Sequence, residues 1–432
     1  MNILSYPSAA ADKRLQKIIH RDIGFRKKDT DAVARIVADV RKNGDAALLT
    51  YARRFDCPEM TTADLAVTSE EFAEARKQVD RRVMNALSRA IRQITAFHRR
   101  QLPNSWVDTA RDGSMLGQMI HPVDAAGVYV PGGQGGTTPL VSSVLMGVIP
   151  ARIAGVPRVV MASPPMANGR LNPYLLVAAE KTGVDAVYKV GSAWAVAGLA
   201  YGTETLPRVD VIVGPGNLYV TLAKKLVAGT VGIDMIAGPS EILIIADNAA
   251  NPEFLAADML SQAEHDKLAS AVLLTTSASV AENTRRALTA QLEALGRREI
   301  AAASIKNFAA ILVVPDLNTA VDLANRIAPE HLELQVAAPL DWVGRIRNAG
   351  AVFMGEHTPE PIGDYIAGPN HVLPTAGTAR FSSALSVETF VKKTSLIYYN
   401  RARFCEEAKD VMALAGVEGL GAHANAVAIR LK

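Results

Sequence analysis

Apolar and polar residues follow two different periods along this chain, and the change falls near residue 124. Between residues 29 and 101 the apolar positions recur three and four residues apart, which predicts long amphipathic helices. A break is expected at Asn43-Gly44. A long helix is expected to begin at Ser69, because a serine followed by two glutamates suits a helix N-terminus. Residues 1–24 lack this pattern and are expected to form an arm without a core of its own.

After residue 124, short apolar runs alternate with helical stretches. Strands that alternate with helices of about 10–15 residues are typical of βαβ units and parallel sheets. The first series of predicted strands covers residues 158–162, 186–190 and 209–213, and the second covers 242–246, 270–276 and 309–314. Two such series predict an α/β protein with two doubly wound, incompletely Rossmann-like domains.

The expected domains are not continuous in the sequence. Residues 25–128 and 240–383 are assigned to the first α/β domain, and residues 129–239 to the second. Residues 384–432 are expected to form a mainly helical C-terminal segment. Two similar glycine-rich turns mark the passage between the two series of strands: VGPGN at 213–217 and AGPSE at 237–241.

The composition favours a soluble globular protein and argues against two classes of partner. Its 46 basic and 43 acidic residues leave a net charge of +3, too balanced for nucleic-acid binding. The apolar runs are too short to span a bilayer, and no signal peptide is visible at the N-terminus. Cys57 and Cys405 have no metal or redox spacing and fit a reducing compartment. A cytoplasmic protein without nucleic-acid or membrane partners is expected.

The stretch DMLSQAEHD at 258–266 contains the first candidate metal ligands. Residues three apart share a helix face, so Gln262 and His265 are expected side by side. A zinc ion needs about four ligands, and other segments must supply the rest. Three side chains nearer the C-terminus are candidates: Asp364, His371 and His423. A solvated helix face with a structural histidine is the alternative.

A second candidate site is the stretch APEHLEL at 328–334. Pro329 suits a first helical position, which places Glu330 and His331 in the first turn of a predicted helix. A glutamate and a histidine together are natural acid/base groups, because histidine titrates near neutral pH and burial raises the pKa of a glutamate. Two surface residues at a capped helix are the alternative.

Glycine-rich turns follow two predicted strands of the first series. YVPGG begins at Tyr129, and GPGN ends at Asn217. Ligands bind outside the carboxyl ends of strands in such sheets, and backbone N–H groups in such turns can hold phosphates. The dinucleotide fingerprint GxGxxG with a following acidic residue is absent. These turns predict a ligand without identifying it.

Several of these motifs, taken together, resemble histidinol dehydrogenase. They are LSQAEHD, APEHLEL, GDYIAGPNHVLPT and EGLGAHANAV, in this order, together with YVPGG, VGPGN and AGPSE. The resemblance extends from about residue 25 to the end of the chain. It implies a zinc-dependent, NAD-linked enzyme that oxidises L-histidinol to L-histidine through L-histidinaldehyde, in the last steps of histidine biosynthesis. It also implies an intertwined homodimer whose C-terminal segment completes the active site of the partner subunit.

The resemblance assigns roles to individual residues. The zinc ligands, for one ion per subunit, fall on Gln262, His265, Asp364 and His423. The acid/base pair falls on Glu330 and His331. Contacts to the small-molecule substrate fall on Ser240, His331, Glu418 and the four zinc ligands. Contacts to NAD fall on Tyr129 and Asn217. His371 is left without an assigned role.

The sequence departs from the family pattern in two places. The turn at 132–141 is longer, and Trp194 stands where the family has a glutamine that contacts NAD. An indole can stack on a cofactor ring, or it can fill space left by the longer turn. Glu418 favours histidinol as the substrate, since an ammonium group calls for a carboxylate. The remaining alternatives are a related dehydrogenase for another small polar alcohol, such as a sulfopropanediol, and a zinc hydrolase.

Overall fold

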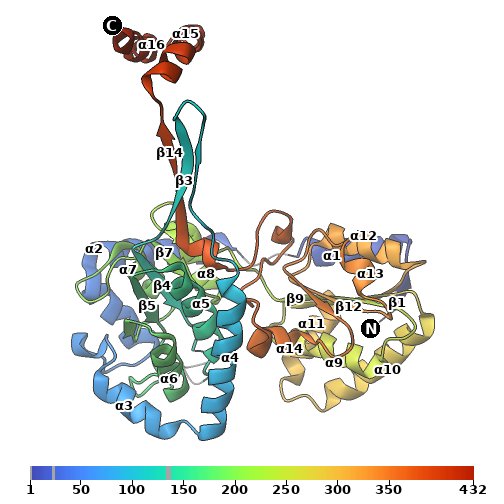
Figure 1. Cartoon of the computed structure of the whole chain (residues 1–432). Coiled ribbons are helices and arrows are strands. Elements are labelled where there is room, and N and C mark those ends of the chain that lie inside the picture. The colour runs from blue at the N-terminus through green and yellow to red at the C-terminus, as the bar shows by residue number, and fades with distance from the viewer. Residues whose placement is uncertain (1, 22–24, 133–137) are drawn as a thin grey trace. The chain divides into compact units, whose positions relative to one another are not determined.

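The computed structural model of the chain describes residues 2–21, 25–132 and 138–432 (Figure 1). It divides into two units, which we call the main unit (Met1–Gln101 and Val123–Phe390) and the small unit (Leu102–Pro122 and Val391–Lys432). The main unit contains two parallel sheets with helices packed on them. The predicted α/β class is therefore confirmed.

The first sheet has six strands in the order β1-β11-β10-β9-β12-β13, and every neighbouring pair is parallel. The strands are β1 (Ile3–Ser5), β9 (Glu241–Ala246), β10 (Ser270–Thr275), β11 (Ala309–Val313), β12 (His331–Gln335) and β13 (Ala351–Met354). The central strands are buried on both faces, as expected for a parallel sheet covered on two sides. The strand order reverses between β9 and β12, so these two strands lie side by side at the switch point.

Helices cover both faces of the six-stranded sheet. One face packs against α9 (Pro252–Ala263), α10 (Ala278–Glu293) and α11 (Arg298–Phe308). The other face packs against α1 (Ala9–Ile19) and α12 (Leu317–Ile327). A short helix, α13 (Leu340–Val343), precedes β13. The predicted helix near Pro252 is confirmed, but it ends at Ala263, before His265.

The second sheet has five parallel strands in the order β6-β5-β4-β7-β8. The strands are β4 (Ala125–Tyr129), β5 (Arg158–Ala162), β6 (Ala186–Tyr188), β7 (Val211–Val213) and β8 (Gly232–Ile233). The helices that follow in the chain are α5 (Val141–Ala154), α6 (Pro173–Thr182), α7 (Ser192–Tyr201) and α8 (Leu218–Val227). The alternation of strands and helices agrees with the pattern read from the sequence.

The N-terminal helices pack against the helices of the five-stranded sheet. They are α2 (Lys27–Phe55), α3 (Ser69–Gln78) and α4 (Arg81–Arg99), which contact α7, α6 and α5 in turn. The break predicted at Asn43-Gly44 is present, because Gly44 interrupts α2 with φ 51°. The helix predicted to run on from Ser69 is two helices. Asp80 starts the second by accepting a hydrogen bond from the Val83 N–H.

The division of the chain differs from the predicted domains in three respects. Residues 1–24 were expected to form an arm, but β1 extends the six-stranded sheet by pairing with β11. The helices within residues 25–128 pack with the five-stranded sheet and its helices. The C-terminal segment from residue 384 includes a long strand, β14 (Val391–Tyr398). Strand pairing and helix packing between distant segments decide each of these placements, and they leave no local pattern in the sequence.

The small unit combines an antiparallel sheet with two helices. The sheet order is β14-β3-β2, with β2 (Trp106–Thr109) and β3 (Met115–Pro122). The helices are α15 (Arg401–Val417) and α16 (Gly421–Ala428). Among the described residues, no helix has both the length and the apolar character that crossing a membrane requires.

Trp194 lies in the hydrophobic core and not on an open face. Only 5% of its surface is exposed, and its ring stacks with Tyr51 and Phe55 of α2, at centroid distances of 5.8 and 5.5 Å. This burial favours the space-filling interpretation over stacking on a cofactor ring. Residues 133–137 of the longer turn at 132–141 lie outside the described residues, so its relation to Trp194 stays a prediction.

Replacement of Trp194 by glutamine should therefore destabilise the main unit. Loss of a buried indole between two aromatic rings is expected to cost about 3 kcal/mol of unfolding free energy. Urea denaturation measures this, with the exposed Leu340→Gln as control. An unchanged stability together with a changed Michaelis constant for NAD would contradict the packing role.

Candidate functional site

His331 is the first residue of β12, and the neighbouring strand fixes its imidazole ring. Its Nδ1 lies 2.9 Å from the carbonyl oxygen of Glu241, the first residue of β9. A carbonyl oxygen can only accept, so Nδ1 carries the hydrogen and Nε2 keeps a lone pair. That Nε2 atom is buried and has no hydrogen-bond partner among the described residues. Burial lowers the pKa of His331 to about 4, so the ring is neutral at pH 7 and able to accept a proton.

Glu330 precedes β12 and exchanges hydrogen bonds with Glu241. The Glu241 N–H donates to Oε2 of Glu330 at 2.9 Å, and the Glu330 N–H donates to Oε2 of Glu241 at 3.2 Å. Burial, and then the charge of Glu241, raises the pKa of Glu330 well above its usual range. A glutamate with a raised pKa is a stronger base once it has lost its proton.

The predicted helical setting of Glu330 and His331 is wrong. Helix α12 ends at Ile327, Ala328 adopts the left-handed conformation with φ 55°, and Pro329 follows. A left-handed residue followed by proline ends a helix, so the chain turns directly into β12. Both side chains are consequently held by the sheet and buried, which excludes the alternative of two surface residues.

Gln262 and His265 lie at the end of α9, close to the acid/base pair. Gln262 is 1% exposed, and its Oε1 atom has no hydrogen-bond partner in the part of the chain that the structure describes. His265 lies in the turn after the helix and is exposed; its N–H bonds to the carbonyl of Gln262 at 3.2 Å. The charge of His265 influences the pKa values of both His331 and His371. The two predicted ligands are therefore near His331, although only one belongs to the helix.

Asp364 lies in a π-helical turn, Gly363–Ala367, and not in an open loop. His331, Glu360 and Asp364 each offer one ligand atom, and these atoms lie within 4.8 Å of one another. The Nδ1 atom of His371 is 3.9 Å from Oδ1 of Asp364. A π-helical turn within a functional site is a common departure from regular structure. This segment brings a cluster of possible metal ligands to the acid/base pair.

Three residues of this cluster lacked an assigned role in the sequence. Glu360 was not considered from the sequence, although it stands four residues before Asp364, a spacing at which helical residues share a face. Burial, and then Asp364, raises the pKa of Glu360 to about 9. Glu241 belongs to the AGPSE turn, to which the sequence motifs assign no chemical role beyond Ser240. His371 was a candidate ligand, and burial lowers the pKa of its ring.

The predicted cofactor residues follow strands of the five-stranded sheet. Asn217 caps α8, its Oδ1 accepting from the N–H groups of Tyr219 and Val220 at 3.0 and 3.1 Å. The preceding turn is anchored by a buried ion pair between Lys224 and Asp234. Lys224 donates to the carbonyl oxygen of Gly214, and the Gly214 N–H donates to the carboxylate of Asp234. This anchoring holds the glycine turn rigidly at the end of β7.

Tyr129 ends β4 and is buried. Its hydroxyl accepts a hydrogen bond from the Ser192 N–H at 3.0 Å, which fixes the start of α7. Burial raises the pKa of this phenol. The structure thus gives Tyr129 a structural contact, and its cofactor contact stays a prediction.

One cavity joins predicted residues from both sheets. It has a volume of about 290 Å³, and its lining includes Asn217, Ser240 and His265. The cavity therefore connects a predicted NAD contact, a predicted substrate contact and a predicted zinc ligand. It is large enough for a small polar ligand, and its lining residue Ser240 directly precedes Glu241, which bonds to both Glu330 and His331.

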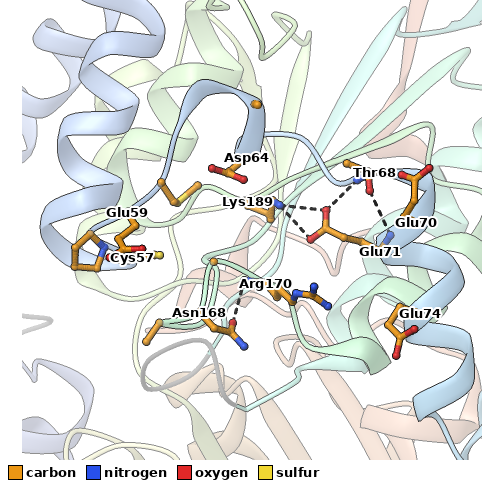
Figure 2. A pocket seen from close by; sticks show the side chains of 15 residues that line it. Cys57, Glu59, Asp64, Thr68, Glu70, Glu71, Glu74, Asn168, Arg170 and Lys189 are labelled. Atoms are coloured by element: carbon orange, nitrogen blue, oxygen red, sulfur yellow. Dashed lines mark hydrogen bonds and ion pairs between the residues drawn. The ribbon is translucent and has the colours of Figure 1, made fainter.

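A larger cavity, of about 1030 Å³, contains none of the predicted site residues (Figure 2). It lies beside α3 and the end of β6. Lys189 points into it and pairs with both carboxylate oxygens of Glu71 at 3.1 Å, while Glu71 also caps α3 through the Thr68 N–H. These contacts satisfy the buried lysine and attach α3 to the sheet, which gives Lys189 and Glu71 a structural role.

Glu418 and His423 belong to the small unit. Glu418 follows the last residue of α15 as its C-cap, and His423 lies in the first turn of α16; both are exposed. The main unit by itself supplies three of the four predicted zinc ligands. The fourth, His423, and the predicted ammonium contact, Glu418, come from a different unit of the chain.

Comparisons of the sequence and of the structure with known proteins lead to the same family. The sequence model of the family described as histidinol dehydrogenase matches residues 21–431. The chain is 57% identical to histidinol dehydrogenase of Desulfotalea psychrophila, over 93% of this chain and 92% of that protein. It is 50% identical to the enzyme of Heliobacterium mobile over the full length of both. A crystal structure of histidinol dehydrogenase from Elizabethkingia anophelis superposes with a TM-score of 0.93 at 34% identity, covering 100% of this chain and 98% of that one.

The lowered pKa of His331 predicts how the free energy of unfolding depends on pH. An unfolded histidine titrates near 6.5 and the folded ring near 4, so between these values the unfolded chain binds more protons. Stability should therefore fall as the pH falls through this window. His331→Gln is expected to remove part of that loss, on the order of 3 kcal/mol. Urea unfolding of the metal-free protein at several pH values measures it, and the exposed His357→Gln should leave the dependence unchanged.

Proposed function

Because the chain belongs to the histidinol dehydrogenase family, we propose that it oxidises L-histidinol to L-histidine through L-histidinaldehyde, with NAD as the hydride acceptor. The first step converts the alcohol to the aldehyde, transferring one hydride and releasing one proton. The second step consumes one water molecule, transfers a second hydride and releases two protons, because the product acid ionises. Histidine biosynthesis is the process that this reaction serves. The two free cysteines, Cys57 and Cys405, support a reducing, cytoplasmic location.

The buried Nε2 atom of His331 carries the proposal for the first step. Its partner nitrogen is held by Glu241, so the lone pair on Nε2 faces the site with no competing donor among the described residues. In the proposal, Nε2 accepts the proton of the substrate hydroxyl while the hydride leaves the carbon. The low pKa of this ring keeps it neutral before the reaction, as a proton acceptor requires.

Glu330 is proposed to act in the second step. Its carboxylate accepts a proton from water while the water oxygen bonds to the aldehyde carbon. The resulting hydrate then loses its hydride to NAD and collapses to the acid. No cysteine is required as a nucleophile. The burial that raises the pKa of Glu330 also strengthens its carboxylate as a base.

The residues present fit the zinc ion that the family implies. Gln262 and His371 each hold a buried polar atom without a hydrogen-bond partner among the described residues, close to Asp364 and His265. Such atoms are costly unless they meet a ligand or an ion. We propose Gln262, His265, Asp364 and His423 as the ligands. A bound zinc ion would orient the amino alcohol and polarise its oxygen.

Glu360 and His331 form a competing ligand set with Asp364. We favour the set with Gln262 and His265, because it leaves Nε2 of His331 free to accept a proton. Glu360 then supports Asp364 by a hydrogen bond from its protonated carboxyl group. Carboxyl groups that orient metal ligands in this way are common around metal sites.

The exposed apolar surface of the small unit supports the proposed homodimer. Ile397, Leu414 and Val417 are 73%, 68% and 88% exposed. These side chains lie on β14 and α15, and exposed apolar surface is typical of interaction sites. We propose that a second copy of the chain covers this surface, and that Glu418 and His423 complete the site of the partner. Glu418 would then bind the substrate ammonium group.

Formation of NADH on addition of L-histidinol tests the activity. A chelator or His265→Ala is expected to lower the rate at least about a hundredfold and to reduce the bound zinc, while the thermal melt stays cooperative. The sheets have cores of their own, so the fold does not depend on the metal. His357→Ala is the control for an exposed histidine. No NADH from histidinol in the zinc-loaded protein would overturn the proposal and favour a hydrolase or another alcohol as substrate.

Mixed dimers test the shared site. Subunits with Glu418→Ala and His423→Ala, and subunits with Glu330→Gln and His331→Ala, are each expected to be inactive. A heterodimer of the two contains one intact site, so about half of the wild-type activity per dimer should return. A verified heterodimer without activity would contradict the shared site.

A further inference from the structure

Glu241 contacts both members of the acid/base pair. Its backbone N–H donates to the Glu330 carboxylate, and its backbone carbonyl accepts from the ring of His331. Its side chain accepts from the Glu330 N–H through Oε2. The two glutamates therefore form a closed ring of hydrogen bonds at the start of β9 and β12. The Glu241 side chain thereby holds the backbone of Glu330, while the Glu241 backbone holds the Glu330 carboxylate.

Arg21 holds that side chain from a distant part of the sequence. Its Nη2 lies 2.5 Å from Oε1 of Glu241, and the Ala376 N–H reaches the same oxygen at 3.1 Å. Arg21 is itself buried, and it donates to the carbonyl oxygens of Ile18 and Pro239 at 3.0 and 3.2 Å. Each oxygen of the Glu241 carboxylate is thus fixed by a hydrogen bond from another segment.

The charge of Arg21 matters as much as its geometry. Glu241 and Glu330 are two buried carboxyl groups in contact, and like charges repel strongly where water is excluded. Without the guanidinium, the Glu241 carboxylate would be buried beside another carboxyl group without its cation, and it would have to move away. Such a movement would break its hydrogen bond from the Glu330 N–H and displace the backbone that carries the Glu330 carboxylate. The imidazole of His331 is held by a backbone carbonyl and does not share this dependence.

We propose that Arg21 is a positioning residue for the oxidation of the aldehyde: through Glu241 it holds the Glu330 carboxylate in the position from which it activates water. Arg21 does not touch the reacting atoms. This inference rests on the proposed role of Glu330 as the base of the second step. An apolar residue could fill the same space at a smaller desolvation cost, but it could not orient Glu241.

The two half-reactions separate this role from simple stabilisation. Arg21→Met should lower kcat for NAD-linked oxidation of the amino aldehyde on the order of tenfold to a hundredfold, because a small displacement of a catalytic group has effects of this size. Reduction of the same aldehyde by NADH does not need water activation. Its kcat, and the Michaelis constants in both directions, should stay within about twofold. Arg21→Lys should restore most of the lost rate.

Arg14 provides a matched control in α1, the helix that ends at Ile19, just before Arg21. It donates to the carbonyl oxygens of Ala309 and Lys306 and so attaches α1 to the sheet without reaching Glu241. Arg14→Met should affect the two half-reactions equally. If Arg21→Met fails to fold, Arg21→Met/Glu241→Gln removes the unpaired charge, and it should fold with the same selective loss.

Glu330→Gln, measured in parallel, distinguishes the possible failures. Full aldehyde oxidation by Glu330→Gln would overturn the proposed role of Glu330 as the base, and the role of Arg21 with it, while NADH formation from histidinol tests the proposed function separately. Impaired oxidation in Glu330→Gln, with unaltered oxidation in Arg21→Met, would overturn only the role of Arg21. Equal losses in both half-reactions of Arg21→Met would reduce Arg21 to a structural residue.

Discussion

The hydrogen bond between the ring of His331 and the backbone carbonyl of Glu241 is the contact on which the rest of the site depends. It exists because β12 pairs in parallel with β9, with His331 opposite Ile242. The pairing brings together two segments separated by about ninety residues and fixes the tautomer of the ring. A shift of the register by one residue would turn His331 to the other face of the sheet. The register of the sheet therefore fixes the orientation and the tautomer of the proposed catalytic imidazole.

The same strand carries an unusual number of buried polar groups on one face. His331, Glu333 and Gln335 alternate with leucines, so all three point to the side covered by α9. Glu333 is fully buried; its oxygens accept from the Glu360 N–H and the Gln335 amide at 3.1 Å, and it bonds to Asp258. Burial, and then Asp258, raises the pKa of Glu333. A protonated carboxyl group can be satisfied in this position where a charged one would be strongly destabilised.

The two sheets carry their predicted sites at opposite ends of their strands. The predicted cofactor turns follow the carboxyl ends of β4 and β7, as is usual for parallel sheets. The acid/base pair instead lies at the amino ends of β9 and β12, just after the C-terminus of α12, and His265 follows the C-terminus of α9. Helix C-termini carry partial negative charge and favour a cation nearby. A metal ion or a substrate ammonium group is therefore favoured over a phosphate at the amino ends of these strands.

The sequence by itself determined the fold class, most strands and helices, and the residue types of the site. These features are local: apolar periodicity, helix caps and short motifs are written in neighbouring residues. Only the tertiary structure showed that Glu330 and His331 begin a strand, that Trp194 is packed between helices, and that β1 joins the six-stranded sheet. It also brought Arg21, Glu241 and Glu360 to the acid/base pair. These outcomes depend on strand pairing and helix packing between distant segments, and each is decided by the burial and hydrogen bonding of the whole chain, for which no short stretch of sequence carries a signal.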